Sequence, residues 1–165
     1  MSAIKLRAYQ QRVIDQLASY LDNDSIHIVA PPGSGKTILG MALVEKIQRK
    51  TLILVPSILL KKQWIEVIQH YYPQWEISEE LLQPANITVT TYQYLYSKRK
   101  ELDNHFTEHG IGFLVLDESH HLKKNWSDLL LDLKEKATEL QTLALTATPP
   151  FDANQKEWGN YIRLT

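Results

Sequence analysis

Apolar residues along this chain alternate between two kinds of pattern. Short runs that are apolar on both faces and rich in β-branched residues are typical of strands buried in a parallel sheet. Between them lie segments whose apolar residues recur every three or four positions, which is typical of helices packed on one face. The strand pattern covers residues 25–29, 51–55, 87–91, 112–116 and 142–146. The helix pattern covers residues 7–21, 36–48, 56–70, 92–109 (in one piece or two) and 127–138.

The two patterns alternate in order, which predicts an α/β fold with a mostly parallel sheet and helices on both faces. Residues 73–85 hold two prolines and three acidic residues and predict a loop. Ser57 stands where a helix N-cap is expected. Ligands of open parallel sheets bind at the carboxyl ends of the strands, so motifs at those ends are the first candidates for function.

The segment APPGSGKT, residues 30–37, follows the first expected strand and opens a helix. A phosphate-binding loop has this setting, because backbone N–H groups and the positive end of the helix point at the phosphates. Gly33 and Gly35 allow the backbone to approach a polyphosphate closely. Lys36 can reach the terminal phosphates, and the Thr37 hydroxyl can bind Mg²⁺. The usual motif begins with Gly where this segment has Ala, and the alternative interpretation is a Gly-rich β–α turn.

A second motif, DESH, follows the apolar run at residues 111–116. An acid at the end of a buried parallel strand lies at the same sheet edge as the phosphate loop, so Asp117 can hold the Mg²⁺ that Thr37 also contacts. Glu118 can orient the water that attacks the γ-phosphate. Taken alone, two acids after a strand indicate a solvated helix start, because acids are favoured there. Together with the phosphate loop they indicate ATP hydrolysis.

A third motif, TATP at residues 146–149, follows the last expected strand. The order and spacing of the three motifs resemble the first RecA-like motor domain of superfamily-two helicases and translocases, on the DExH side of that group. The segment LRAYQ at residues 6–10 resembles the element that precedes the phosphate loop in such proteins. The resemblance is nearest to bacterial helicases of the type III restriction and excision-repair kinds. It implies a RecA-like P-loop NTPase domain over essentially the whole chain.

The resemblance also implies ATP and Mg²⁺ as cofactors and a role for each motif residue. In similar proteins the Gln of the N-terminal element bonds adenine and its Arg packs on the base. The implied nucleotide-binding residues are Arg7, Gln10, Pro32, Gly33, Ser34, Gly35, Lys36 and Thr37. The implied catalytic residues are Lys36, Asp117 and Glu118, with Thr37 and Asp117 as metal ligands. The resemblance implies that His120, Thr146 and Thr148 couple the nucleotide state to the binding of nucleic acid.

Two further strand ends resemble the nucleic-acid contacts of this group. The residues concerned are Pro56, Ser57, Gln63, Thr91 and Tyr92. Hydroxyl groups and backbone N–H groups at such positions suit phosphate oxygens and read no base sequence. The alternative interpretations are a helix cap for Ser57 and ordinary β-propensity for the threonine.

For several other residues a structural role is preferred to a chemical one. Trp64 is interpreted as a core aromatic residue. His105 and His109 are interpreted as a surface pair and not a metal site, because no HExxH motif is present. The basic clusters at 61–62, 98–100 and 123–124 are interpreted as solvated faces, and 98–100 is the best phosphate-contact candidate among them.

Length, composition and charge limit the classes of protein that the chain can represent. With 165 residues and 44% hydrophobic content, the chain fits one domain with a sizeable core, over residues 1–165. The chain has no run of about eighteen apolar residues, so no membrane span is predicted, and no secretion signal opens the chain. The chain contains no cysteine, which fits a cytoplasmic location. Because the net charge is only −1, a local patch and not the charge of the whole chain would hold nucleic acid. DNA is expected as the partner in preference to RNA.

The expected activity is incomplete in one respect. Similar motors take arginine fingers from a second RecA-like domain, and the only arginine after Arg99 is Arg163. A finger is typically worth about 10³–10⁵ in rate, so we expect slow hydrolysis by this chain alone, as a piece of a longer motor. Two alternatives are a nucleotide kinase or AAA-type ATPase, and a non-catalytic nucleic-acid-binding domain. TATP has no place in the first, and the intact acids argue against the second.

Overall fold

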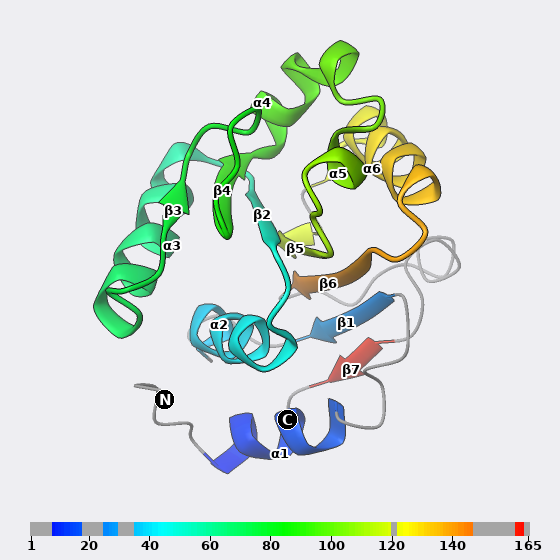
Figure 1. The fold of residues 1–165 in the computed structure, drawn as a ribbon. Coiled ribbons are helices and arrows are strands. Elements are labelled where there is room, and N and C mark those ends of the chain that lie inside the picture. The colour runs from blue at the N-terminus through cyan, green and yellow to red at the C-terminus, as the bar shows by residue number, and fades with distance from the viewer. Residues whose placement is uncertain (1–7, 18–24, 30–34, 120–121, 147–160, 164–165) are drawn as a thin grey trace.

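The protein is described by a computed structural model over residues 8–17, 25–29, 35–119, 122–146 and 161–163. The strands form one seven-stranded sheet in the order β3-β4-β2-β5-β6-β1-β7, and each neighbouring pair is parallel (Figure 1). They are β1 (Ser25–Val29), β2 (Thr51–Val55), β3 (Ile77–Ser78), β4 (Ile87–Thr91), β5 (Phe113–Asp117), β6 (Gln141–Thr146) and β7 (Tyr161–Arg163).

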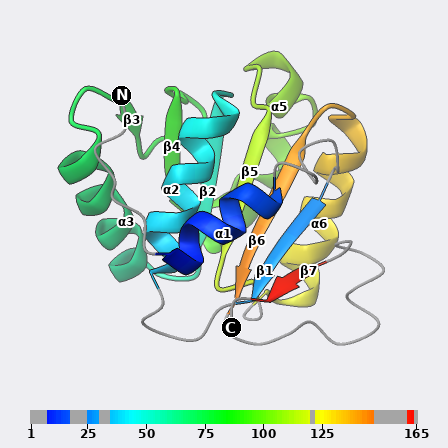
Figure 2. The same ribbon diagram turned by 90° about the horizontal axis from the view of Figure 1, so that it is seen from below.

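Helices cover both faces of the sheet (Figure 2). One face carries α1 (Ala8–Leu17), α2 (Lys36–Ile47) and α3 (Ile58–Tyr71). The other carries α4 (Tyr92–Ser97), a 3-10 turn η1 (Arg99–Glu101), α5 (His105–Glu108) and α6 (Lys124–Lys136). Within the described residues no helix is both long and apolar enough to cross a bilayer.

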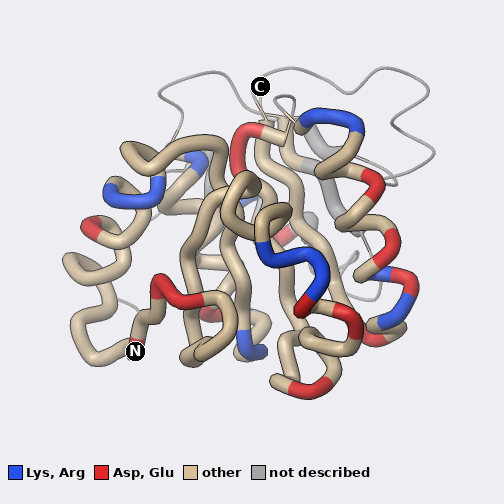
Figure 3. Tube along the Cα trace, turned by 90° about the horizontal axis from the view of Figure 1, so that it is seen from above, with Lys and Arg blue, Asp and Glu red and all other residues tan. Residues whose placement is uncertain are grey.

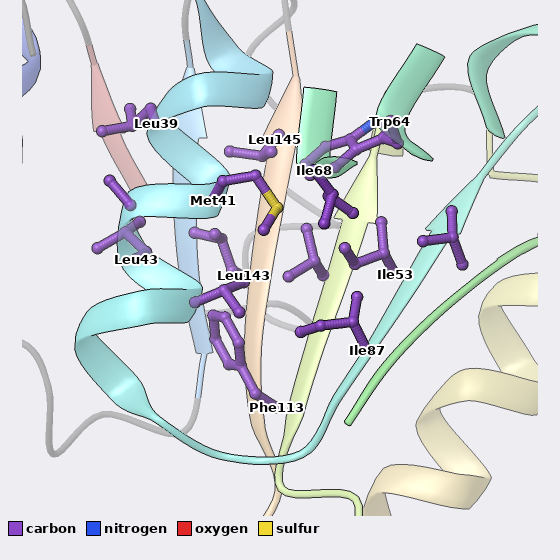
Figure 4. Close-up of a cluster of buried hydrophobic side chains, with 14 of the residues drawn as sticks. Leu39, Met41, Leu43, Ile53, Trp64, Ile68, Ile87, Phe113, Leu143 and Leu145 are labelled. Atoms are coloured by element: carbon purple, nitrogen blue, oxygen red, sulfur yellow. The ribbon is translucent and has the colours of Figure 1, made fainter. Parts of the chain in front are cut away.

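The core consists of two hydrophobic clusters, one on each face of the sheet. Because side chains alternate along a strand, Ile53 and Val55 of β2 join the cluster under α2 and α3, whereas Leu52 and Leu54 join the cluster under α4 to α6. Figure 4 shows this first cluster: Met41 of α2 points toward Leu143 and Leu145 of the sheet, and Trp64 of α3 lies at one end. Each fully buried aliphatic or aromatic side chain contributes about 1.5–3 kcal/mol, so both clusters hold the strand ends in place.

The sequence predicted most of this arrangement. Strands β1, β2 and β4 have the predicted bounds, while β5 and β6 differ from their predictions by one residue at one or both ends. The segment 92–109 forms α4, η1 and α5, where a helix in one or two pieces was expected. The start of α6 was wrong by three residues, because Lys123 at its N-cap makes no side-chain capping bond that a sequence pattern would reveal.

Two short strands were not predicted. β3 lies within the segment predicted as a loop, and it exists through the pairing of Ile77 with Ile87 and of Ser78 with Thr88. β7 pairs with β1 over residues 161–163. Both are edge strands of two or three residues, so they depend on a partner far away in sequence and carry little periodic signal of their own.

Candidate functional site

The candidate site lies at the carboxyl edge of the sheet. Because all strands are parallel, the chain leaves β1, β2, β4 and β5 at the same edge. There β1 leads toward α2, β2 leads to α3, and β4 leads to α4. The motif residues predicted from separate parts of the sequence are therefore placed along one edge.

The described part of the phosphate loop begins at Gly35, which caps α2 without a side-chain hydrogen bond. Its φ angle of 82° lies in the left-handed region, where glycine carries no Cβ penalty. Lys36 and Thr37 form the first turn of α2, and both are half-buried. The open N–H groups and positive dipole of that turn suit an anion, and α2 is long enough for the effect.

Lys36 meets Glu118 at this edge, although 82 positions separate them in the chain. The Lys36 ammonium donates a hydrogen bond of 2.5 Å to Oε1 of Glu118. Their side chains are 11% and 23% exposed, so the pair is largely shielded and still open to a ligand from one side. A phosphate oxygen bound by Lys36 would lie within reach of the Glu118 carboxylate.

Asp117, the last residue of β5, is held by three hydrogen bonds. The Trp64 indole Nε1–H donates to Oδ2 at 2.7 Å, and the backbone N–H of Glu118 donates to Oδ1 at 2.9 Å. The Tyr92 hydroxyl donates to the backbone carbonyl of Asp117 at 2.8 Å. These bonds fix both the side chain and the backbone of the residue.

The electrostatics of the site follow from burial. Burial raises the pKa of Asp117 above its usual value, and the Trp64 hydrogen bond and the Lys36 charge oppose that rise. Burial, and then the charges of Asp117 and Glu118, raise the pKa of Tyr92 well above 10.0. Tyr92 therefore stays neutral and remains a hydrogen-bond donor.

Glu118 has a φ angle of 49°, which is uncommon for a residue with a side chain. Such backbone conformations cost about 1–3 kcal/mol and gather at functional sites. Here the turn directs the Glu118 side chain toward Lys36, whereas the Asp117 side chain stays in contact with Trp64. Two adjacent acids thereby obtain different surroundings.

The donor chemistry fits Mg²⁺. Thr37 offers a hydroxyl oxygen and Asp117 a carboxylate oxygen, which are hard ligands of the kind that Mg²⁺ prefers. Among the described residues no three His, Cys, Asp or Glu side chains gather as a metal cage. A few protein oxygens completed by water and substrate phosphates are the usual environment of this ion.

Several predicted site residues lie outside the described residues. These are Arg7, Pro32, Gly33, Ser34, His120 and Thr148. Gln10 is part of α1, and its side chain is also outside the described part. Thr146 is buried at the end of β6, next to β1 and thus close to the start of the phosphate loop.

The predicted nucleic-acid residues lie at the starts of α3 and α4. Ser57 caps α3 by accepting a hydrogen bond of 3.2 Å from the N–H of Leu60. Gln63, about one helical turn after Leu60, is exposed. Thr91 caps α4 in the same way, with 3.0 Å to the N–H of Tyr94. Pro56 is half-buried. The capping interpretation is therefore confirmed for Ser57, whereas the cap at Thr91 was not predicted, and each hydroxyl can also donate.

Tyr92 needs a correction. Its side chain is completely buried, and its hydroxyl is bonded to the carbonyl of Asp117, so the ring and hydroxyl are not available to nucleic acid. The strand-end position suggested a contact, but the alternation of side chains at this turn points Tyr92 inward. The whole residue is 0% exposed, so it offers no surface for a nucleic-acid contact.

The histidine prediction was also wrong. His105 is only 4% exposed, so it does not form a surface pair with His109, although the two rings lie 4.4 Å apart. Residues of two basic clusters contact nearby side chains: Lys61 pairs with Glu79, and Arg99 lies over the Tyr96 ring. These contacts agree with the interpretation as surface faces.

Trp64 is a site residue that sequence reasoning placed only in the core. Its ring is buried as predicted, at 1% exposure, yet its N–H contacts a carboxylate 53 positions away. No local pattern announces such a pair. A buried indole usually needs a hydrogen-bond acceptor, and that requirement is the one signal that the sequence offered.

Comparison with known proteins agrees with this geometry. Residues 3–151 match the family described as the res subunit of type III restriction enzymes. A "DNA 3'-5' translocase XPB2" of Sulfurisphaera tokodaii is 33% identical over 156 residues, which cover 93% of this chain and 33% of the relative. A "DNA 3'-5' helicase XPB" of Mycobacterium tuberculosis is 32% identical over 87% of this chain and 26% of the relative.

Solved structures share the fold at low sequence identity. The helicase domain of Pyrococcus furiosus Hef has a TM-score of 0.74 and 19% identity, covering 96% of this chain and 38% of that one. The UvsW helicase of bacteriophage T4 has a TM-score of 0.73 and 17% identity, covering 97% and 60%. The chain spans about a quarter to a third of the length of the curated relatives that it matches first. It belongs to the family of the type III restriction enzyme res subunit and has the fold of the first RecA-like domain of superfamily-two helicases.

Proposed function

We propose that this chain is the ATP-binding motor domain of a DExH-type helicase or translocase, which couples ATP hydrolysis to nucleic-acid binding. The observation that carries the proposal is the meeting of Lys36 and Glu118, beside Asp117, at the start of α2. A positive side chain, a helix N-terminus and two acids in different surroundings form the arrangement that hydrolysis of a nucleoside triphosphate needs.

Each residue has a distinct task in the proposed reaction. Lys36 and the N–H groups at the start of α2 bind the phosphates and offset their charge. Thr37 and Asp117 would hold Mg²⁺, which neutralises charge on the phosphates when bound. Glu118 orients the attacking water and accepts its proton. Asp117 suits metal binding better than proton transfer, because hydrogen bonds to both of its oxygens hold the carboxylate in one orientation.

The proposed track is nucleic acid, with DNA favoured. The relatives described above carry DNA helicase and translocase names, and two similar structures contain a DNA duplex or a DNA substrate mimic. Basic and acidic residues are interspersed over the described elements (Figure 3). Binding would therefore rest on local contacts between the nucleic-acid backbone and Pro56, Ser57, Gln63 and Thr91, and not on a uniformly basic face.

A second RecA-like domain is part of the proposal. It would supply arginine side chains at the γ-phosphate, which typically raise the rate about 10³–10⁵-fold, so this domain alone would bind ATP and turn it over slowly. We also propose residues 1–165 as one ATP-binding domain, acting in the cytoplasm where ATP and nucleic acid meet.

Substitution of Glu118 by Gln tests the proposed chemistry. The variant keeps the size of the side chain and loses the carboxylate, so Mg²⁺-ATP binding measured by calorimetry should persist while turnover falls at least about 100-fold. Glu108→Gln on α5 is the matched control, because Glu108 is exposed and on the opposite face of the sheet from α2. Equal turnover by the wild-type protein and Glu118→Gln would contradict the proposal and favour a non-catalytic binding domain.

A further inference from the structure

We propose that Trp64 is a positioning residue for Asp117, and that α3 and α4 pass the state of nucleic-acid binding to Asp117 through Trp64 and Tyr92. The inference rests on the proposed function, because it takes Asp117 as a metal ligand and the starts of α3 and α4 as nucleic-acid contacts. It adds a physical connection between them.

The first connection runs through α3. This helix begins after Ser57, and its buried face carries Trp64, whose indole N–H bonds Oδ2 of Asp117 at 2.7 Å. Glu118 N–H donates to the other oxygen, Oδ1, at 2.9 Å, so the two bonds together fix the rotation of the carboxylate. A shift of α3 would therefore turn the carboxylate and change the oxygen that it presents to a metal.

The same indole also touches the helix that carries Lys36 and Thr37. A Cβ added to Gly40 of α2 would lie 2.9 Å from the Cη2 atom of Trp64, so the ring sits directly against the α2 backbone. Trp64 thus contacts both parts of the site, the phosphate-binding helix and the acid at the end of β5. A buried indole needs an acceptor in any case, and here that acceptor is the proposed metal ligand itself.

The second connection runs through α4. This helix begins after the cap Thr91 with Tyr92, whose hydroxyl bonds the carbonyl oxygen of Asp117 at 2.8 Å. The Tyr92 ring stacks on Trp126 of α6, with centroids 5.8 Å apart and planes inclined by 18°, which holds the ring from the other side. The two helices proposed to contact the nucleic-acid backbone therefore each donate one hydrogen bond to the same residue.

This arrangement makes the coupling reciprocal. Suppose that bound nucleic acid favours the position of α3 and α4 in which Asp117 is best placed to bind the metal. Bound Mg²⁺-nucleotide must then favour nucleic-acid binding by the same factor. Groups that orient metal ligands from behind typically change metal affinity about 10–100-fold when removed. An effect of this size is expected for the Trp64 N–H.

Nucleotide affinity with and without Mg²⁺ provides the test. The non-hydrolysable analogue of ATP, AMP-PNP, is titrated into the 165-residue chain with Mg²⁺ or with EDTA. Trp64→Phe should reduce the gain in affinity that Mg²⁺ brings about 10–100-fold and leave the affinity in EDTA unchanged. Trp75→Phe is the control, because Trp75 stacks on Tyr72 away from the site and should keep the full gain. A full gain in Trp64→Phe would overturn the inference.

A shape-preserving replacement guards against a merely structural effect. Benzothienylalanine at position 64 keeps the bicyclic ring and lacks only the N–H, and it should give the same loss as Trp64→Phe. If this analogue behaves as the wild-type protein does, Trp64 acts through packing and the inference is wrong. Tyr92→Phe, which keeps the ring stack on Trp126, should lower the Mg²⁺ gain in the same direction.

The coupling has its own spectroscopic readout. The Trp64 indole N–H resonance, assigned by its loss in Trp64→Phe, should shift with Mg²⁺-AMP-PNP and should shift again on addition of a DNA oligonucleotide. If DNA binds and this resonance does not move, the coupling is overturned. A wild-type protein that binds no nucleotide under either condition would contradict the proposed function itself, which is a distinguishable outcome.

Discussion

Gly35 and Glu118 lie at the proposed phosphate site, and both have positive φ angles, 82° and 49°. The first was foreseeable, because a glycine in a phosphate-binding loop indicates a left-handed backbone. The second was not, because a glutamate rarely adopts this conformation and its contact with Lys36 is tertiary. At this scale the sequence identified the chemistry of the side chains but not their backbone conformations.

Gly35→Ala tests the residue at the start of α2. A Cβ in the left-handed region costs about 1–2 kcal/mol, so the free energy of unfolding should fall by that amount in urea titrations. Nucleotide affinity should fall as well, because the first turn of α2 is displaced. Gly110→Ala is the control: its φ is 68° and nothing lies within 4 Å of an added Cβ, so it should lose similar stability and keep full affinity. Equal affinity in both variants would contradict the role of Gly35.

His105 predicts a pH dependence of stability. Burial, then the neighbouring His109, lowers the pKa of His105 below its usual value, whereas the unfolded chain binds the proton at about pH 6.5. The unfolded state therefore holds more protons below that pH, and the contribution to stability that is present above pH 6.5 is lost as the pH falls. His105→Gln should flatten the stability profile between about pH 7 and 5, measured by urea unfolding. The control His70→Gln, at an exposed position, should keep the wild-type slope, and an unchanged slope in His105→Gln would contradict the argument.

Elements were predictable where their own residues determine them. Strands β2 and β4 are rich in apolar and β-branched residues and have the predicted bounds, and Ser57 was a correct N-cap. β3 could not be found, because two residues pair only when β4 is already in place. The contact of α3 with Asp117 was equally hidden, because the sequence shows that Trp64 is buried but not which acceptor it meets.

The packing of α2 against α3 can be tested at Gly40. An added Cβ would lie 2.9 Å from the Trp64 ring and 3.2 Å from Leu145, both fixed in the core. Such overpacking typically costs about 1–3 kcal/mol, so Gly40→Ala should lower the free energy of unfolding by that amount. In Gly112→Ala the added Cβ meets the end of the flexible Arg49 side chain, which can swing away, so the loss should be smaller. Equal losses, measured by urea unfolding, would show that α2 and α3 are not tightly packed here.

The whole molecule brings the described residues of three motifs, 35–37, 117–119 and Thr146, to the carboxyl edge of one parallel sheet. Sequence reasoning supplied the fold class and the residue types, and the order of motifs indicated the family that the comparisons then showed. The actual pairs, Lys36 with Glu118 and Trp64 with Asp117, arise from the strand order β2-β5-β6-β1. That order is set by packing over the whole chain. The sequence therefore placed Lys36 and Glu118 at one site but did not reveal their direct bond, nor the contact of Trp64 with an acid.

Calorimetric titration of the wild-type chain with Mg²⁺-ATP tests the central claim, that Lys36, Asp117 and Glu118 converge on one magnesium triphosphate. We predict saturable binding at a single site, and a loss of about 10–100-fold in Lys36→Ala, because a charged hydrogen bond is worth about 1.5–3 kcal/mol. Lys46→Ala, at the exposed far end of α2, should bind as the wild-type protein does. No binding by the wild-type chain, or equal affinity in Lys36→Ala, would contradict the account.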